Sequence, residues 1–136
     1  MIKWLEKNRK ISLILTILIA IEIFYFSSIP GTAGVGIGGN DWIPRMYHFS
    51  VFFLFSFFFF ITIKGNKKIK PIHLVIVLIV SITHAILDEF HQTYVPFRYP
   101  SISDVLTNSL GIFFSTATYL YANKIKQKTQ DIRHKA

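Results

Sequence analysis

The chain has 136 residues, of which 51% are hydrophobic, and it carries a formal net charge of +8. So apolar a composition excludes an ordinary soluble domain, and the short length excludes division into several domains. Because the sequence has no cysteine, disulfides, thiolate nucleophiles and cysteine-based metal centres are excluded as well.

The hydrophobic residues form four continuous stretches, at about residues 11–28, 46–63, 71–87 and 105–122. As a helix with a rise of ~1.5 Å per residue, each stretch is long enough to cross a bilayer with little tilt. Lipid offers the backbone no hydrogen-bond partners, so the stretches should be helical. The sequence therefore predicts an all-α integral membrane bundle of four transmembrane helices over residues 11–122. A cytoplasmic N-terminus at residues 1–10 precedes it, and a basic cytoplasmic tail at residues 123–136 follows it.

Most basic residues lie in three clusters that alternate with the apolar stretches: near the N-terminus, at residues 64–70, and after residue 123. This spacing favours a membrane and argues against nucleic acid as a partner. Because loops rich in lysine and arginine stay inside, both termini are expected in the cytoplasm of a multi-pass cell-membrane protein. A cleaved signal peptide is the competing interpretation of the first stretch, but Glu22 interrupts it and its removal would leave three crossings.

Polar residues gather on the opposite, outer side, in the loops at about residues 29–45 and 88–103 and in the adjoining helix halves. Ionisable groups at membrane depth are costly and usually face a bundle interior or a water-filled cavity. The densest group ends the third stretch and contains His84, Asp88, Glu89, His91 and Gln92. His84, Asp88 and His91 share one helical face, but their spacing matches no established zinc motif. Neither a metal nor a cofactor is expected.

The start of the fourth stretch carries a capping pattern. Ser101 or Ser103 can accept a hydrogen bond from an exposed backbone amide, and Asp104 complements the positive end of the helix. Asn108 and Gly111 continue the same stripe. Because small residues let helices approach and an asparagine can hydrogen-bond between them, Asn108 is expected to join two helices.

The two outer loops hold one basic residue each, Arg45 and Arg98. Glu22, on the first stretch, needs a partner, and these arginines are the basic residues on its side. Arg98 lies between two aromatic residues in a loop with two prolines. A guanidinium held there suits recognition of phosphate or carboxylate, although pairing with Glu89 or Asp104 is equally consistent with the sequence.

These motifs resemble those of the VanZ-like family of membrane proteins, which is named for a teicoplanin-resistance accessory protein. The resemblance covers about residues 20–120 and is carried by Phe26-Ser27-Ser28-x-Pro30-Gly31, Asp41, His48-Phe49 and Asp88-Glu89-x-His91-Gln92-x-Tyr94-Val95-Pro96-x-Arg98-x-x-Ser101-x-x-Asp104-x-x-x-Asn108-x-x-Gly111. It implies a multi-pass membrane protein, some relatives of which reduce susceptibility to glycopeptide antibiotics. The family usually has glycine before the arginine, where this chain has Phe97, so the loop is expected to adopt a left-handed turn less easily.

We expect the outer polar group to engage a membrane lipid, a lipid-linked cell-wall precursor or a glycopeptide antibiotic. The residues expected to bind it are Asp41, His48, Asp88, Glu89, Gln92, Arg98, Ser101, Asp104 and Asn108. The alternative is an intramembrane enzyme acting on a lipid-linked substrate, with Glu89, His91 or Asp104 as candidate catalytic residues. A structural or assembly protein, in which the same groups hold helices together, is a third hypothesis.

Overall fold

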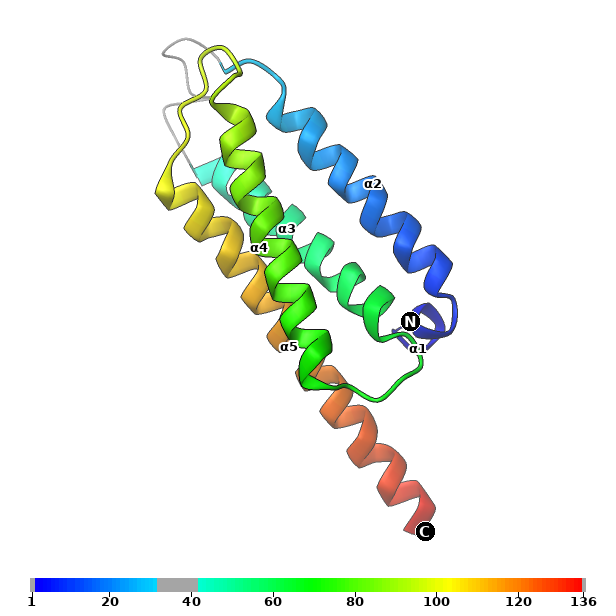
Figure 1. The fold of residues 1–136 in the computed structure, drawn as a ribbon. Helices are drawn as coiled ribbons and strands as arrows, with labels where there is room; N and C mark the ends of the chain where they lie inside the picture. The colour runs from blue at the N-terminus through cyan, green and yellow to red at the C-terminus, as the bar shows by residue number, and fades with distance from the viewer. Residues whose placement is uncertain (1, 32–41, 136) are drawn as a thin grey trace.

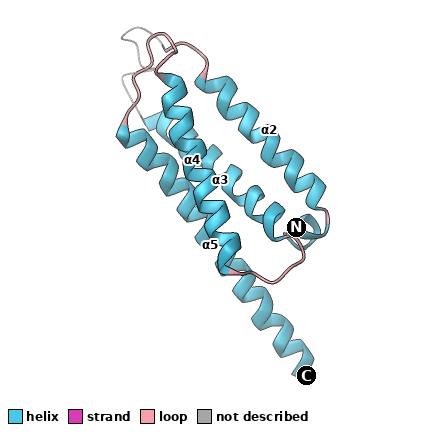
Figure 2. Ribbon diagram, viewed as in Figure 1, coloured by secondary structure: helices cyan, strands magenta, loops and turns pink. Residues whose placement is uncertain are grey.

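The protein is an all-α bundle, seen in a computed structural model that describes residues 2–31 and 42–135 (Figure 1). These residues form α1 (Ile2–Lys7), α2 (Arg9–Ser27), α3 (Trp42–Lys64), α4 (Pro71–Gln92) and α5 (Ile102–Lys135). Helices and short connections account for all of them, with no strand among the described residues (Figure 2). The all-α fold class is confirmed.

The four long helices lie alongside one another, and α3 contacts every other helix of the described chain. We call the end where α2 and α4 finish and α3 and α5 begin the distal end. The opposite, proximal end holds the N-terminus and the connection at residues 65–70, and α5 projects beyond it (Figure 1). Consecutive long helices are thus antiparallel, as short connections require.

Helix boundaries differ from those predicted at the distal end. α3 begins at Trp42 and not near Met46, and α4 continues to Gln92 instead of ending near Leu87. No proline or glycine interrupts α4 before Pro96, so nothing in the sequence stops it earlier. Asp88, which was expected to open a loop, is therefore helical, as are the three polar residues that follow it.

Three helices of the described chain are long and apolar enough to cross a membrane: α2, α3 and α4. The fourth predicted span lies in α5, which is not in this group. Its polar residues Asn108, Ser115 and Thr116 are buried against the other helices, whereas Leu106 and Phe114 are exposed. Two features therefore lower the average hydropathy of α5: the polar side chains of its inner face and the basic segment after residue 123.

α2, like α5, buries polar side chains and exposes large apolar ones. Its buried face includes Ser12, Thr16 and Ser27, while Ile14 and Ile21 are more than half exposed. Small polar side chains inside and large apolar ones outside are typical of helices packed in lipid, where close approach replaces hydrophobic burial as the source of association.

The packing between α3 and α5 depends on Gly111. A Cβ atom added there would lie 2.4 Å from the carbonyl oxygen of Phe49 and 3.2 Å from the amide nitrogen of Phe53. The two backbones therefore approach more closely than any side chain at this position would allow. The small residue predicted to let helices approach does so.

A buried polar cluster joins three helices at the proximal end. Glu6 of α1 accepts hydrogen bonds at 2.6 Å from both the Lys64 ammonium of α3 and the Tyr119 hydroxyl of α5. All three side chains are almost completely buried. An ion pair so removed from water fixes α1 against the bundle, because separating the charges would leave them buried without compensation.

Candidate functional site

The site at the distal end is framed by two connecting segments that meet. The amide of Gly31, just beyond α2, donates to the carbonyl oxygen of Pro96 at 3.0 Å. A Cβ at Gly31 would lie 2.1 Å from the carbonyl oxygen of Phe97, so only glycine permits this contact. Phe97 itself has φ 60°, in the left-handed region. The left-handed turn thus forms although phenylalanine disfavours it, and the hydrogen bond between Gly31 and Pro96 holds the two segments together there.

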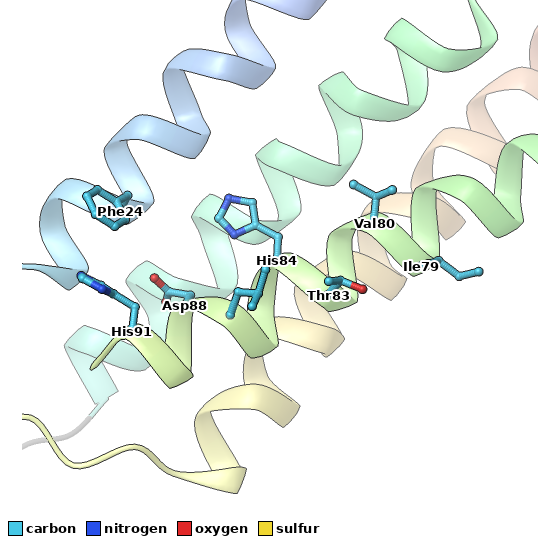
Figure 3. A pocket seen from close by; sticks show the side chains of 8 residues that line it. Phe24, Ile79, Val80, Thr83, His84, Asp88 and His91 are labelled. Atoms are coloured by element: carbon cyan, nitrogen blue, oxygen red, sulfur yellow. The ribbon is translucent and has the colours of Figure 1, made fainter. Parts of the chain in front are cut away.

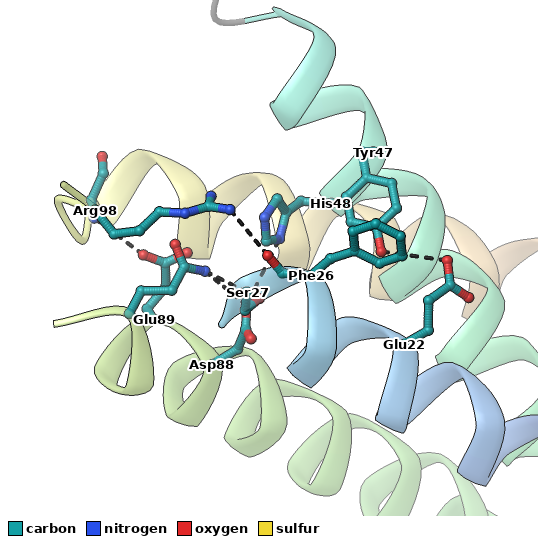
Figure 4. Close-up of polar contacts among 10 residues, drawn as sticks. Glu22, Phe26, Ser27, Tyr47, His48, Asp88, Glu89 and Arg98 are labelled. Carbon is teal, nitrogen blue, oxygen red and sulfur yellow. Dashed lines mark hydrogen bonds and ion pairs between the residues drawn. The ribbon is translucent and has the colours of Figure 1, made fainter. Parts of the chain in front are cut away.

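Arg98 fastens the α4–α5 connection to the end of α2. Its Nε donates to the carbonyl oxygen of Ile29 at 3.1 Å. One of its terminal nitrogens donates to the carbonyl oxygen of Phe26, also at 3.1 Å (Figure 4). A cation is favoured there because the last carbonyl groups of a helix lack internal partners. Among the described residues, no carboxylate lies within ion-pair distance of Arg98. The pairing with Glu89 or Asp104 allowed by the sequence is thus absent.

The two carboxylates have other partners. Asp104 lies 3.6 Å from Nε of Arg45, and this pair is partly exposed. Glu89 is buried and accepts a hydrogen bond from the amide of Ser101 at 3.2 Å. Ser101 in turn accepts from the amide of Ser103 at 3.1 Å, which confirms the predicted cap of α5.

Glu22 was expected to pair with one of the two arginines, and this expectation was wrong. The hydroxyl of Tyr47 donates to it at 3.4 Å (Figure 4). Arg45 and Arg98 instead contact Asp104 and the end of α2, respectively. The rotation of α3, which sequence periodicity does not fix, decides which of its residues faces Glu22.

A histidine and an aspartate face each other across α3 and α4. Oδ2 of Asp88 lies 3.8 Å from Nδ1 of His48, and it also accepts a hydrogen bond from Gln92 at 3.1 Å. Gln92 lies 3.5 Å from the hydroxyl oxygen of Ser27 on α2, so the group spans three helices (Figure 4). Asp88 and Gln92 are each only 5% exposed.

These groups border a cavity of about 370 Å³, which we call the distal polar cavity. Its lining residues come from the starts of α3 and α5, the end of α4 and the connection between them: Pro44, Arg45, His48, Gln92, Arg98, Tyr99, Ser101 and Asp104. Two guanidinium groups, an imidazole, an amide, two hydroxyls and one carboxylate therefore line one space, and the carboxylate, Asp104, is paired with Arg45. Such a set of donors suits an oxyanion such as phosphate.

A second depression, the α2–α4 groove, has a volume of about 470 Å³ and is mainly apolar (Figure 3). His84, Asp88 and His91 line it, so the predicted common face of these residues is confirmed. His91 stacks on Phe24 with ring centroids 4.6 Å apart and shares a hydrogen bond of 3.0 Å with Ser28. His91 therefore belongs to the groove and not to the distal polar cavity.

The structure sorts the predicted site residues into three groups. His48, Gln92, Arg98, Ser101 and Asp104 line the distal polar cavity, while Asp88 and Glu89 are buried beside lining residues. Asn108 is fully buried, and neither its oxygen nor its nitrogen has a hydrogen-bond partner among the described residues. It therefore does not make the predicted bond between helices. Asp41 lies outside the described residues.

Sequence reasoning missed Arg45 and Tyr99 as lining residues. The predicted outer loop at about residues 29–45 includes Arg45, so the sequence suggests this residue only as a partner for Glu22. A signal was nonetheless present, since Arg45 precedes His48 by one helical turn and both therefore lie on one face of α3. Within the described residues, no group of three His, Asp or Glu side chains is arranged to hold a metal ion.

Comparison with known proteins adds one match. A family model described as VanZ/LLP1 matches residues 11–123, which include α3 and α4 in full and most of α2 and α5. No curated protein and no solved structure matches the chain.

Proposed function

Because the chain belongs to the VanZ/LLP1 family, we propose that it is a multi-pass protein of the cell membrane whose distal polar cavity binds a lipid by its phosphate group. The lipid is a membrane phospholipid or a lipid-linked cell-wall precursor. In this proposal four helices cross the bilayer, both termini lie in the cytoplasm, and the cavity opens on the outer side. The proximal position of the basic connection at residues 65–70 supports this orientation.

The observation that carries the proposal is that Arg98 keeps an unneutralised positive charge at the cavity. Its two hydrogen bonds go to neutral carbonyl groups, and no carboxylate of the described chain pairs with it. A guanidinium has five N–H donors in a fixed fork, so further donors remain for a ligand. A charge held in this way at the rim of a cavity attracts an anion, and the fork matches two oxygens of a phosphate.

Crossing of the membrane by α5 is part of the proposal. Its buried face is polar and its outer face carries Leu106, Leu110, Phe113 and Phe114, each at least half exposed. Exposure of four large apolar side chains on one helix is unfavourable in water and favourable in lipid. The helix also lies alongside α3 over the length of the bundle, as a neighbouring span would (Figure 1).

Binding of an anionic lipid to the purified protein tests the proposal. In nanodiscs of phosphatidylcholine, titration with phosphatidic acid should give saturable binding to the wild type. Arg98→Ala should weaken it by about 10- to 100-fold, because a hydrogen bond to a charged group contributes about 1.5–3 kcal/mol. Lys67→Ala is the matched control, since this exposed cation lies at the proximal end and should not affect affinity.

Arg98 also fastens the connection to α2, so the thermal midpoint of each variant must be measured in parallel. Arg98→Lys retains the charge while losing the fork, and it should bind with intermediate affinity. If Arg98→Ala lowers the thermal midpoint but leaves the affinity for phosphatidic acid unchanged, the residue is structural and the proposal fails.

A glycopeptide antibiotic is the alternative occupant of the cavity, suggested by the family resemblance. Cells expressing the wild type would then be less susceptible to teicoplanin than cells expressing Arg98→Ala or Glu89→Gln. Equal susceptibility, with all three proteins present in the membrane at equal levels, would remove the antibiotic from the proposal and leave lipid binding to be judged by the titration.

A further inference from the structure

We propose that the distal polar cavity also hydrolyses a lipid phosphate monoester such as phosphatidic acid, with His48 as the base and Asp88 as the residue that positions it. This inference rests on the proposed function, because the substrate is the anionic lipid held by Arg98. The observation that carries it is the placement of a histidine between a buried carboxylate and a cavity lined by two arginines.

The two nitrogens of His48 have different surroundings. Nδ1 is buried, has no hydrogen-bond partner among the described residues, and lies 3.8 Å from the Asp88 carboxylate. His48 also lines the cavity, and Nδ1 is the only ring nitrogen of His48 among the buried, unpartnered atoms of the described chain. A short movement would let Nδ1–H donate to Asp88, and hydrogen bonds of this kind are often long before a substrate binds. That bond would leave Nε2 as the unprotonated nitrogen, which is the one that can act as the base.

Asp88 is held in place for this role. Gln92 donates to the same oxygen, Oδ2, at 3.1 Å and approaches Ser27 of α2 at 3.5 Å. A carboxylate so oriented fixes the tautomer of the histidine and stabilises the imidazolium that forms when the histidine takes a proton. The pair is therefore close to the geometry of a base and its positioning residue, and the short movement of His48 described above would complete the hydrogen bond.

The reaction consumes one water molecule. Nε2 of His48 removes a proton from this water as its oxygen forms a bond to phosphorus. The bond between phosphorus and the ester oxygen breaks, and that oxygen leaves with the electron pair and takes a proton from solvent. His48 then returns its proton to solvent, so that a phosphate monoester and water give an alcohol and inorganic phosphate. Arg98, which has no carboxylate partner among the described residues, opposes the negative charge on the phosphoryl oxygens, and the charge of Arg45 is shared with Asp104.

The other titratable groups at this end are less well placed. The Glu89 carboxylate accepts a hydrogen bond from the Ser101 amide and borders a separate depression between α4 and α5. His91 faces the α2–α4 groove and is stacked on Phe24. Asp104 is engaged with Arg45. Glu89 and His91 thus face other depressions, and Asp104 lines the cavity but is paired with Arg45. Among the described residues, His48 is the imidazole that lines the cavity.

Release of inorganic phosphate tests the inference. The full-length protein, reconstituted in phosphatidylcholine vesicles containing phosphatidic acid, should release phosphate without added metal. His48→Gln should lower kcat by about 100- to 10,000-fold, the usual contribution of a general base. Asp88→Asn should lower kcat with little change in KM, whereas loss of packing alone would reduce the amount of active protein. His73→Gln, at the proximal end, is the matched control and should retain wild-type kcat.

The outcomes separate this inference from the function it rests on. If phosphatidic acid binds but no phosphate is released, or if His48→Gln releases it at the wild-type rate, hydrolysis by this site is refuted and binding stands. If phosphatidic acid does not bind, both fall. Glycerol 3-phosphate is the water-soluble counterpart, and its hydrolysis in preference to phosphatidic acid would refute the lipid as the substrate.

Discussion

Single residues at the distal end hold conformations that only their neighbours explain. Phe97 has φ 60°, which costs a residue with a side chain about 1–2 kcal/mol. The turn persists because the amide of Gly31 donates a hydrogen bond to the carbonyl oxygen of Pro96, and because Arg98 binds the backbone at the end of α2. Local strain of this kind is retained where the surrounding structure requires it. Here the left-handed turn at Phe97 orients Arg98, the next residue, toward the end of α2.

Replacement of Phe97 by glycine should stabilise the protein. Glycine adopts a positive φ without steric penalty, and the aromatic ring is 59% exposed, so little packing is lost. The larger freedom of glycine in the unfolded chain offsets part of the gain, which leaves a net stabilisation of up to about 1 kcal/mol. Thermal unfolding of the detergent-solubilised protein should show a higher midpoint.

Phe97→Ala serves as the control for this experiment. Alanine also removes the ring but retains a Cβ, so the strain of the left-handed turn remains. An equal rise in midpoint for Phe97→Ala would show that the gain comes from removing an exposed aromatic ring, and the strain argument would be wrong.

At the scale of elements, contact between α3 and α5 determines the shape of the site. These parallel helices contribute Arg45, His48, Ser101 and Asp104 to the distal polar cavity, and Gly111 sets the distance between them. Because Gly111 lies between one and three turns below these residues, a change in spacing there is transmitted to the cavity.

Gly111→Ala should therefore destabilise the bundle and weaken lipid binding together. The added methyl group would lie 2.4 Å from the Phe49 carbonyl oxygen, which is backbone and cannot rotate away. Overpacking of this kind typically costs about 1–3 kcal/mol. Thermal unfolding in detergent and titration with phosphatidic acid measure the two effects.

Ala117→Leu is the matched control, because it adds more volume to α5 at an exposed position. Its thermal midpoint should be close to that of the wild type. If Gly111→Ala behaves like Ala117→Leu, α3 and α5 can separate without penalty, and the close approach is not what sets the geometry of the cavity.

For the whole molecule, the proposed orientation in the membrane rests on the arrangement of polar and apolar surfaces. Many large apolar side chains face outward on α2 and α5, whereas the small polar ones of these helices are buried between the helices together with an apolar core that includes Ile23 and Ile112. The distal polar cavity and the basic connection at residues 65–70 lie at opposite ends of the bundle. With the basic connection in the cytoplasm, the cavity would open to the outside.

Labelling of single cysteines can test this orientation, and the sequence offers a background without cysteine. In intact cells, a membrane-impermeant maleimide should label Tyr94→Cys, which is exposed at the distal end. Lys67→Cys and Lys124→Cys, both exposed in the proximal half, should react only after permeabilisation. Labelling of Lys124→Cys in intact cells would show that α5 does not cross the membrane.

The sequence by itself determined the helical class, the places of the long helices and the family. Each depends on runs of apolar residues or on motifs that are local in the chain, so neighbouring residues suffice to reveal them. It also determined which end of the bundle is polar. The cap at Ser101 and the close approach at Gly111 were predictable for the same reason, since both arise within one or two helical turns.

Only the tertiary structure decided which polar groups meet. Arg98 binds carbonyl groups 69 and 72 residues earlier and not a nearby carboxylate, and His48 faces Asp88 across two helices. Helical periodicity shows which residues share a face but does not fix how each helix is rotated and shifted against its neighbours. A change of one residue in that register would exchange the partners, so the site became visible only when the helices were packed together.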